Sequence, residues 1–108
     1  MDTSLTWLSP WYPVDDTSVG QGLEHQLRRE ICSSHVLAGE TVRLIARRAD
    51  TDDALFALAD SRVAEVHLTW KNGTEEDPRW PATAVFASID DWARESMRPL
   101  HDELSRMR

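Results

Sequence analysis

The sequence has few of the residues on which secreted and nucleic-acid-binding proteins depend. Cys32 is the only cysteine in 108 residues, so the chain can form no internal disulfide, which excludes a secreted disulfide framework. Lys71 is the only lysine, and 12 basic residues stand against 19 acidic ones. The net charge of −7 opposes the phosphate contacts that nucleic-acid binding requires, so we expect no nucleic-acid partner.

Long apolar runs and known catalytic motifs are missing as well. Residues 1–13, MDTSLTWLSPWYP, hold an acidic residue at Asp2 and fit neither a signal peptide nor a membrane helix. No string resembles a phosphate-binding loop, a dinucleotide fingerprint, a nucleophile elbow or a zinc-protease helix. We therefore expect a cytoplasmic protein without a membrane partner or a cofactor.

The single cysteine offers little chemistry. Cys32 and His35 have a spacing that two metal ligands can use, but no second pair completes a tetrahedral site. Cys32 also falls at the predicted end of a helix, where the helix dipole opposes thiolate formation. We expect a packed thiol and no metal. Since no nucleophile is paired with a base and an orienting acid, we also expect a protein that is not an enzyme.

The composition is that of one globular domain over residues 1–108. Hydrophobic residues make up 41% of the chain and charged residues 29%, which is ordinary globular usage. Residues 1–16 form an aromatic arm in which Pro10 and Pro13 exclude a helix. We expect this arm to pack on the domain, and the alternative is that its aromatic residues dock on a partner or a second subunit.

Two helices are predicted from capping residues and apolar spacing. Ser18 with Gln21 has the form of a capping box, which predicts a helix that begins directly after Ser18. Ser88 with Asp91 is a second capping box and begins a C-terminal helix with an apolar stripe. Pro99 lies within that stripe, so we expect a kink or a restart there.

Alternating and apolar runs between the helices predict strands. The four runs, separated by turns and by one long loop at residues 71–81, are residues 41–48, 54–59, 62–70 and 82–88. The predicted fold is therefore α+β, in the order α-β-β-β-β-α. We expect a four-stranded antiparallel sheet with the N-terminal and C-terminal helices packed on one face.

Strand parity divides the third run, RVAEVHLTW, into two faces. Glu65 and His67 point to the face that the predicted helices leave open. If the first and third strands align, Arg43 and Arg47 share that face, and the four side chains could bind an anion or a small molecule. The alternative is a solvated face held by ordinary ion pairs. The residues expected in the core on the opposite face are Ala64, Val66, Leu68 and Trp70, joined by Trp92 of the C-terminal helix.

Trp80 is the other candidate for recognition. It stands between Pro78 and Pro81 beside an acidic stretch of the long loop. A tryptophan in such a loop can act as the aromatic anchor of a protein interface, or it can close one end of the core. Both interpretations of Trp80 stay open at the level of sequence.

Three strings, WLSPWYP, VHLTW and PRWPATAVFAS, are followed by a helix that carries a tryptophan. Together they resemble a family of small uncharacterised bacterial proteins. The resemblance spans most of the chain and implies a stand-alone bacterial protein. It implies no activity and transfers no functional residues.

The residues themselves favour a protein whose function is to bind another protein. One concrete form is an immunity-like protein that neutralises a basic toxin, because an acidic surface speeds encounter with a basic partner. One alternative is a small-molecule or anion-binding protein or enzyme that uses the polar face around His67. Another is a homodimer in which a second subunit covers that face.

Overall fold

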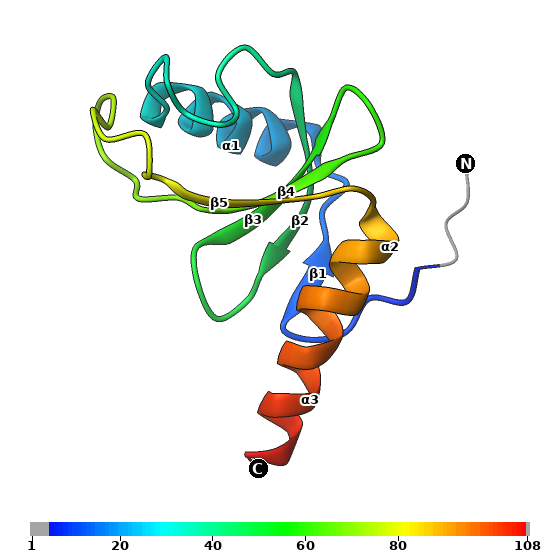
Figure 1. The fold of residues 1–108 in the computed structure, drawn as a ribbon. Coiled ribbons are helices and arrows are strands. Elements are labelled where there is room, and N and C mark those ends of the chain that lie inside the picture. The colour runs from blue at the N-terminus through cyan, green and yellow to red at the C-terminus, as the bar shows by residue number, and fades with distance from the viewer. Residues whose placement is uncertain (1–4, 108) are drawn as a thin grey trace.

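The computed structural model describes residues 5–107, and its centre is a five-stranded antiparallel sheet whose strands lie in chain order (Figure 1). The first four residues of the predicted arm lie outside this range. The strands are β1 (Trp11–Pro13), β2 (Val42–Arg48), β3 (Asp53–Leu58), β4 (Val63–His67) and β5 (Ala82–Phe86). The helices are α1 (Thr17–Glu30), α2 (Ile89–Trp92), a π-helical segment (Ala93–Met97) and α3 (Arg98–Arg106).

The α+β class and the antiparallel sheet are confirmed, but the sheet has one strand more than predicted. The additional strand, β1, comes from the aromatic arm, where Trp11 pairs with Arg48 and Pro13 pairs with Ala46. Proline is tolerated in an edge strand because its missing N–H faces away from the ladder. A strand of three residues next to prolines has no alternation by which it could be recognised in the sequence.

The prediction that both helices pack on one face is wrong, because each face of the sheet has its own helix and its own core (Figure 1). In β3, Phe56 packs in the cluster that contains Leu27 of α1, whereas Leu55 packs in the cluster that contains Trp92. Nearly every residue of β3 is buried, as is typical of a central strand covered on both sides. The arm adds Trp11 to the second cluster, with its ring 5.1 Å from that of Trp92.

Of the two capping residues predicted from the sequence, one caps its helix in the structure and the other does not. Asp16, not Ser18, caps α1, since its Oδ1 accepts from the backbone N–H of Ser18 at 2.9 Å. The helix therefore begins at Thr17, two residues earlier than the capping box predicts. The hydrogen bond from the Ser18 hydroxyl is the largest cause that lowers the pKa of Asp16. Ser88 does cap the C-terminal helix, and its hydroxyl accepts from Asp91 N at 3.1 Å.

The C-terminal helix passes Pro99 by changing its hydrogen-bonding pattern. The segment before Pro99 is π-helical, and Arg98 N donates to Ala93 O, five residues back. The next α-helical stretch starts at Arg98, where the sequence predicts a restart. Such π-helical segments shift the side chains that follow them around the helix axis. Trp92, directly before the segment, and Ser96, within it, both donate to Glu65 Oε1 in the sheet.

Candidate functional site

A β-bulge separates the two arginines that the sequence places on one face. Leu44 pairs with Phe56 but Ala46 pairs with Leu55, so one extra residue lies in β2 between them. Because a bulge reverses the alternation beyond it, Arg43 points to the side of the C-terminal helix and Arg47 to the side of α1. The expected arrangement of Arg43 and Arg47 beside each other is therefore wrong.

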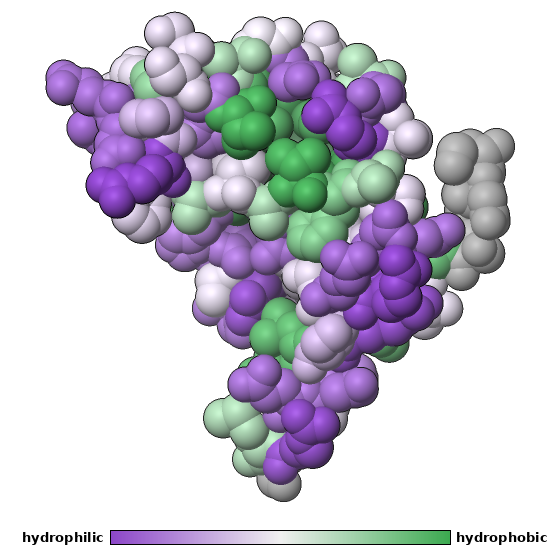
Figure 2. All heavy atoms as spheres, viewed as in Figure 1, coloured by the Kyte–Doolittle hydropathy of each residue, from purple (hydrophilic) through white to green (hydrophobic). Residues whose placement is uncertain are grey.

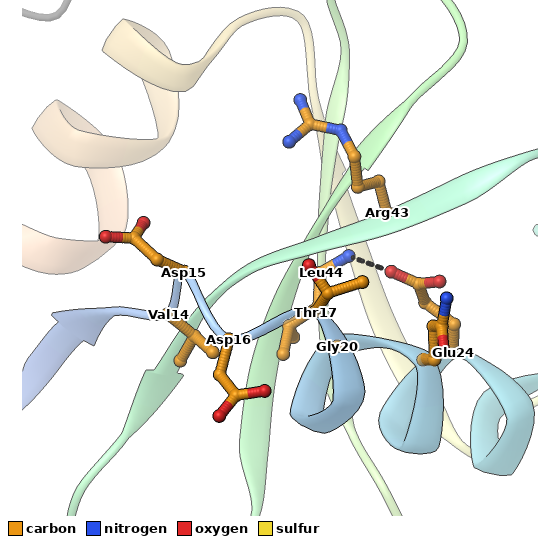
Figure 3. A pocket seen from close by; sticks show the side chains of 9 residues that line it. Val14, Asp15, Asp16, Thr17, Gly20, Glu24, Arg43 and Leu44 are labelled. Carbon is orange, nitrogen blue, oxygen red and sulfur yellow. Dashed lines mark hydrogen bonds between the residues drawn. The ribbon is translucent and has the colours of Figure 1, made fainter.

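Arg43 lines a hollow of about 310 Å³ between the start of α1 and β2 (Figure 3). In this hollow Glu24 Oε2 accepts from Leu44 N at 2.9 Å, which satisfies the backbone next to the bulge. Figure 3 shows Arg43 and Asp15 extending away from Glu24 instead of converging on one point. The hollow therefore holds a structural hydrogen bond, and its charged groups do not form a ligand site.

Glu65 lies on the face that the sequence leaves open, but the C-terminal helix covers it there. Its Oε1 accepts from Trp92 Nε1 at 2.8 Å and from Ser96 Oγ at 2.6 Å. A partly buried carboxylate with these donors fastens the helix to the sheet. In this structure Glu65 is an anchor for Trp92.

His67 Nδ1 forms a hydrogen bond with Asp53 Oδ1 at the uncovered end of the same face. The two residues are directly opposite in the β3–β4 ladder. Arg48 Nη1 lies 3.6 Å from Asp53 Oδ2, and the Nε and Nη2 groups of Arg48 donate to Asp50. Of the four predicted polar-face residues, only Glu65 and His67 are thus brought together, and Arg48 and Asp53 take the places expected for Arg43 and Arg47.

A shallow hollow of about 290 Å³ opens beside this pair. Its lining holds two carboxylates and one imidazole, together with the small residues Ala82, Thr83 and Ala84. The Asp53 carboxylate orients the imidazole ring of His67 through Nδ1. Among residues 5–107 no group of three or more histidine, cysteine or acidic side chains is arranged to hold a metal ion.

Trp70 leaves the core because the chain turns outward directly after β4. Its φ of 59° is in the left-handed region, which residues other than glycine seldom adopt. Glu30, which is fully buried at the end of α1, imposes this turn by accepting from Thr69 N at 2.8 Å and from Trp70 N at 2.9 Å. Trp70 is consequently 46% exposed, so its predicted place in the core is wrong.

Trp80 stands at the other end of the same loop and is 45% exposed. Its backbone N–H donates to Asp77 O at 3.0 Å, and the next residue is held by His35, whose Nε2 lies 3.0 Å from Pro81 O. His35 Nδ1 accepts from Leu37 N, so both ring nitrogens have partners. The loop is thus fixed at both ends while its two tryptophan side chains remain accessible.

Glu30, Asp53 and Arg48 are functional or organising residues that the sequence interpretation misses. A signal for Glu30 is present in the sequence, because Gln26 and Glu30 follow Leu23 and Leu27 on the inward side of α1. A polar pair at inward positions of a helix indicates a buried hydrogen-bond network. No comparable signal exists for Arg48, whose orientation depends on the bulge.

No family model, no curated protein and no solved structure matches this chain. Within residues 5–107 no helix has both the length and the apolar character needed to cross a membrane.

Acid is expected to weaken the fold below about pH 4. Hydrogen bonds from Arg79 hold the pKa of Asp77 at about 2, and Arg48 likewise lowers the pKa of Asp50. The folded state then binds fewer protons than the unfolded state, so stability that is complete above about pH 4 is lost as the pH falls toward about 2. Urea midpoints measured across this range check the prediction.

The control for this acid series is Asp77→Asn, which removes one of the titrating groups. It should have a shallower loss of stability in acid than the wild-type chain, because its side chain no longer binds a proton on unfolding. A wild-type midpoint that stays constant or rises as the pH falls would contradict the assignment.

Proposed function

We propose that this chain is a protein-binding protein whose contact surface is the loop of residues 68–81, and that its partner is a basic protein. The observation that carries the proposal is the presence of Trp70 and Trp80, each nearly half exposed, on a loop whose ends are fixed. Tryptophan is enriched among the residues that dominate interface energetics. A loop that is already ordered loses less conformational entropy when it binds.

The charge of the chain supports a basic partner. Two of the loop's acidic residues are already paired, Asp77 with Arg79 at 2.6 Å and Glu75 with Lys71 at 3.4 Å. Glu76 is exposed, and the whole chain carries a net charge of −7. A field of this sign accelerates encounter with a basic surface. A protein that neutralises a basic toxin is one function that such a surface would serve.

The small-molecule alternative has weaker support. The hollow beside His67 is lined by carboxylates, which suit a cation or a hydrogen-bond donor better than an anion. Arg43 lines the hollow beside α1 and not this one, and Glu65 already binds Trp92 and Ser96. The loop surface offers two tryptophans that are each nearly half exposed, so we favour it as the binding surface.

The proposal is tested by comparing three immobilised proteins in an extract of the organism that encodes the chain. These are the wild type, the Trp70→Ala/Trp80→Ala double variant and Met107→Ala, a control that removes an exposed apolar side chain directly after α3. We expect a basic protein to be retained by the wild type and the control and released by added salt. The double variant should lose it, because each anchor residue contributes about 2 kcal/mol, or roughly 30-fold in affinity. Retention of no basic protein, or equal retention by the double variant, would contradict the proposal.

A further inference from the structure

The two edges of the sheet are protected very differently. At one edge, β1 has only three residues and includes Pro13, which prevents a further strand from pairing along it. At the other edge, β5 has five residues, ATAVF, with neither a proline nor a charge (Figure 1). Natural edge strands without such protection pair readily with another strand. The β5 edge is therefore the position in this fold where another strand can be added.

The register shows which backbone groups of β5 face outward. Leu58 N donates to Arg62 O at 3.0 Å, so these residues are a hydrogen-bonded pair of the β3–β4 hairpin. Such pairs recur at every second residue, and the intervening residues of β4 bond to β5. Their β5 partners are Ala82, Ala84 and Phe86. Thr83 and Val85 thus direct their N–H and C=O groups outward, and within residues 5–107 neither makes a backbone hydrogen bond outside its own ladder.

The surface around this edge is neutral in a strongly acidic chain. Residues 81–89 contain no formally charged side chain, and the same holds for residues 31–39 apart from His35. His35 brings these segments together, with Nε2 3.3 Å from Thr83 Oγ1. Val36 is 60% exposed and Val85 36% exposed. Figure 2 faces the β5 edge and shows hydrophobic surface gathered across it, bordered by hydrophilic surface.

We propose that β5 pairs with β5 of a second copy of this chain, antiparallel about a two-fold axis at Ala84. In this register Thr83 lies opposite the partner subunit's Val85, and these are the residues whose backbone groups face outward on each copy. Ala84 lies opposite its own counterpart at a non-hydrogen-bonded position, where strands approach to about 4.5 Å between Cα atoms and small side chains fit best. The strand is thus complementary to itself.

Side chains on both faces of the sheet agree with this pairing. On the α1 face, the exposed Val36 lies next to His35 and Thr83, and would meet the partner subunit's Val85. On the other face, Ala82 would lie beside the partner subunit's Phe86, at the hollow that contains His67. Two identical chains of charge −7 repel each other, so they can associate best through a segment without charge. A basic partner would gain nothing electrostatically from this neutral edge, which favours a second copy as its occupant.

Sedimentation equilibrium across the micromolar range tests the proposal directly. We expect the wild type to have twice the chain mass of 12.3 kDa, and Val85→Pro to have 12.3 kDa. Proline at residue 85 removes an outward N–H and leaves the β4–β5 ladder intact, so circular dichroism should show an unchanged fold. A wild-type chain that is monomeric throughout the range would overturn the proposal.

A second pair of variants keeps the test decisive if Val85→Pro does not fold. Val85→Lys adds a charge that natural edge strands use against pairing, and Val19→Lys adds the same charge at an equally exposed valine on α1. We expect a monomer for Val85→Lys and a dimer for Val19→Lys. A dimer for Val85→Lys would place the interface elsewhere and overturn the proposal. The dimer does not depend on the loop tryptophans, so loss of partner binding in their variants leaves this result unaffected.

Discussion

Replacing Glu30 with alanine is expected to lower the free energy of unfolding by about 4 kcal/mol. The Glu30 carboxylate has no exposed surface and accepts from the backbone of Thr69 and Trp70, the Thr69 hydroxyl and Gln26 Nε2. Alanine leaves these buried and partly buried donors without their acceptor. Each buried donor without a partner costs about 1–3 kcal/mol, and relaxation of the loop recovers part of the sum.

Urea unfolding of three variants measures this effect. Glu30→Gln keeps the size and one acceptor oxygen and should fall between the wild type and Glu30→Ala. Glu103→Ala is the matched control, because Glu103 is exposed on α3 and its loss should change stability by less than about 0.5 kcal/mol. Faster amide exchange at Thr69 and Trp70 should accompany the loss in Glu30→Ala. A Glu30→Ala protein within about 1 kcal/mol of the wild type would show that Glu30 does not hold the loop.

Trp92→Ala is expected to have a comparable effect, about 4 kcal/mol, through the loss of packing. Trp92 is fully buried, its ring lies 5.8 Å from that of Trp7 and 5.1 Å from that of Trp11, and its Nε1 binds Glu65. The change opens a cavity where the arm, the sheet and the C-terminal helix meet. It also removes a donor from Glu65.

The matched control for Trp92→Ala is Trp80→Ala, which removes the same side chain from an exposed position. It should change the free energy of unfolding by less than about 0.5 kcal/mol. Trp92→Phe should lie between the two, because it keeps most of the packing but not the hydrogen bond. Equal destabilisation by Trp92→Ala and Trp80→Ala would contradict the division of the tryptophans into core and surface.

The sequence predicts the elements of this fold better than their arrangement. The existence of strands β2 and β4 and the Ser88 cap depend on neighbouring residues, and the structure confirms them. Which face of the sheet each helix covers depends on packing between segments that are far apart in the sequence, so local patterns do not predict it. The run DALFAL did contain the relevant signal, since a strand that is apolar at successive positions needs a cover on both sides.

The candidate site was harder to predict because it depends on two local departures from regular geometry. The bulge between Leu44 and Ala46 reverses the sides of the residues that follow, and nothing in VRLIARR indicates it. The turn at Trp70 results from Glu30, a residue 40 positions earlier in the chain. Parity alone therefore placed Trp70 in the core, although it correctly placed Glu65 and His67 on one face.

The central claim is that the loop tryptophans serve binding, whereas Trp92 serves folding. Calorimetric titration of the retained basic protein into wild type, Trp70→Ala/Trp80→Ala and Met107→Ala tests it most directly. We expect the wild type and Met107→Ala to bind equally and the double variant to bind at least roughly 100-fold more weakly, with an unfolding midpoint close to that of the wild type. Equal affinity of the double variant and the wild type would contradict the claim.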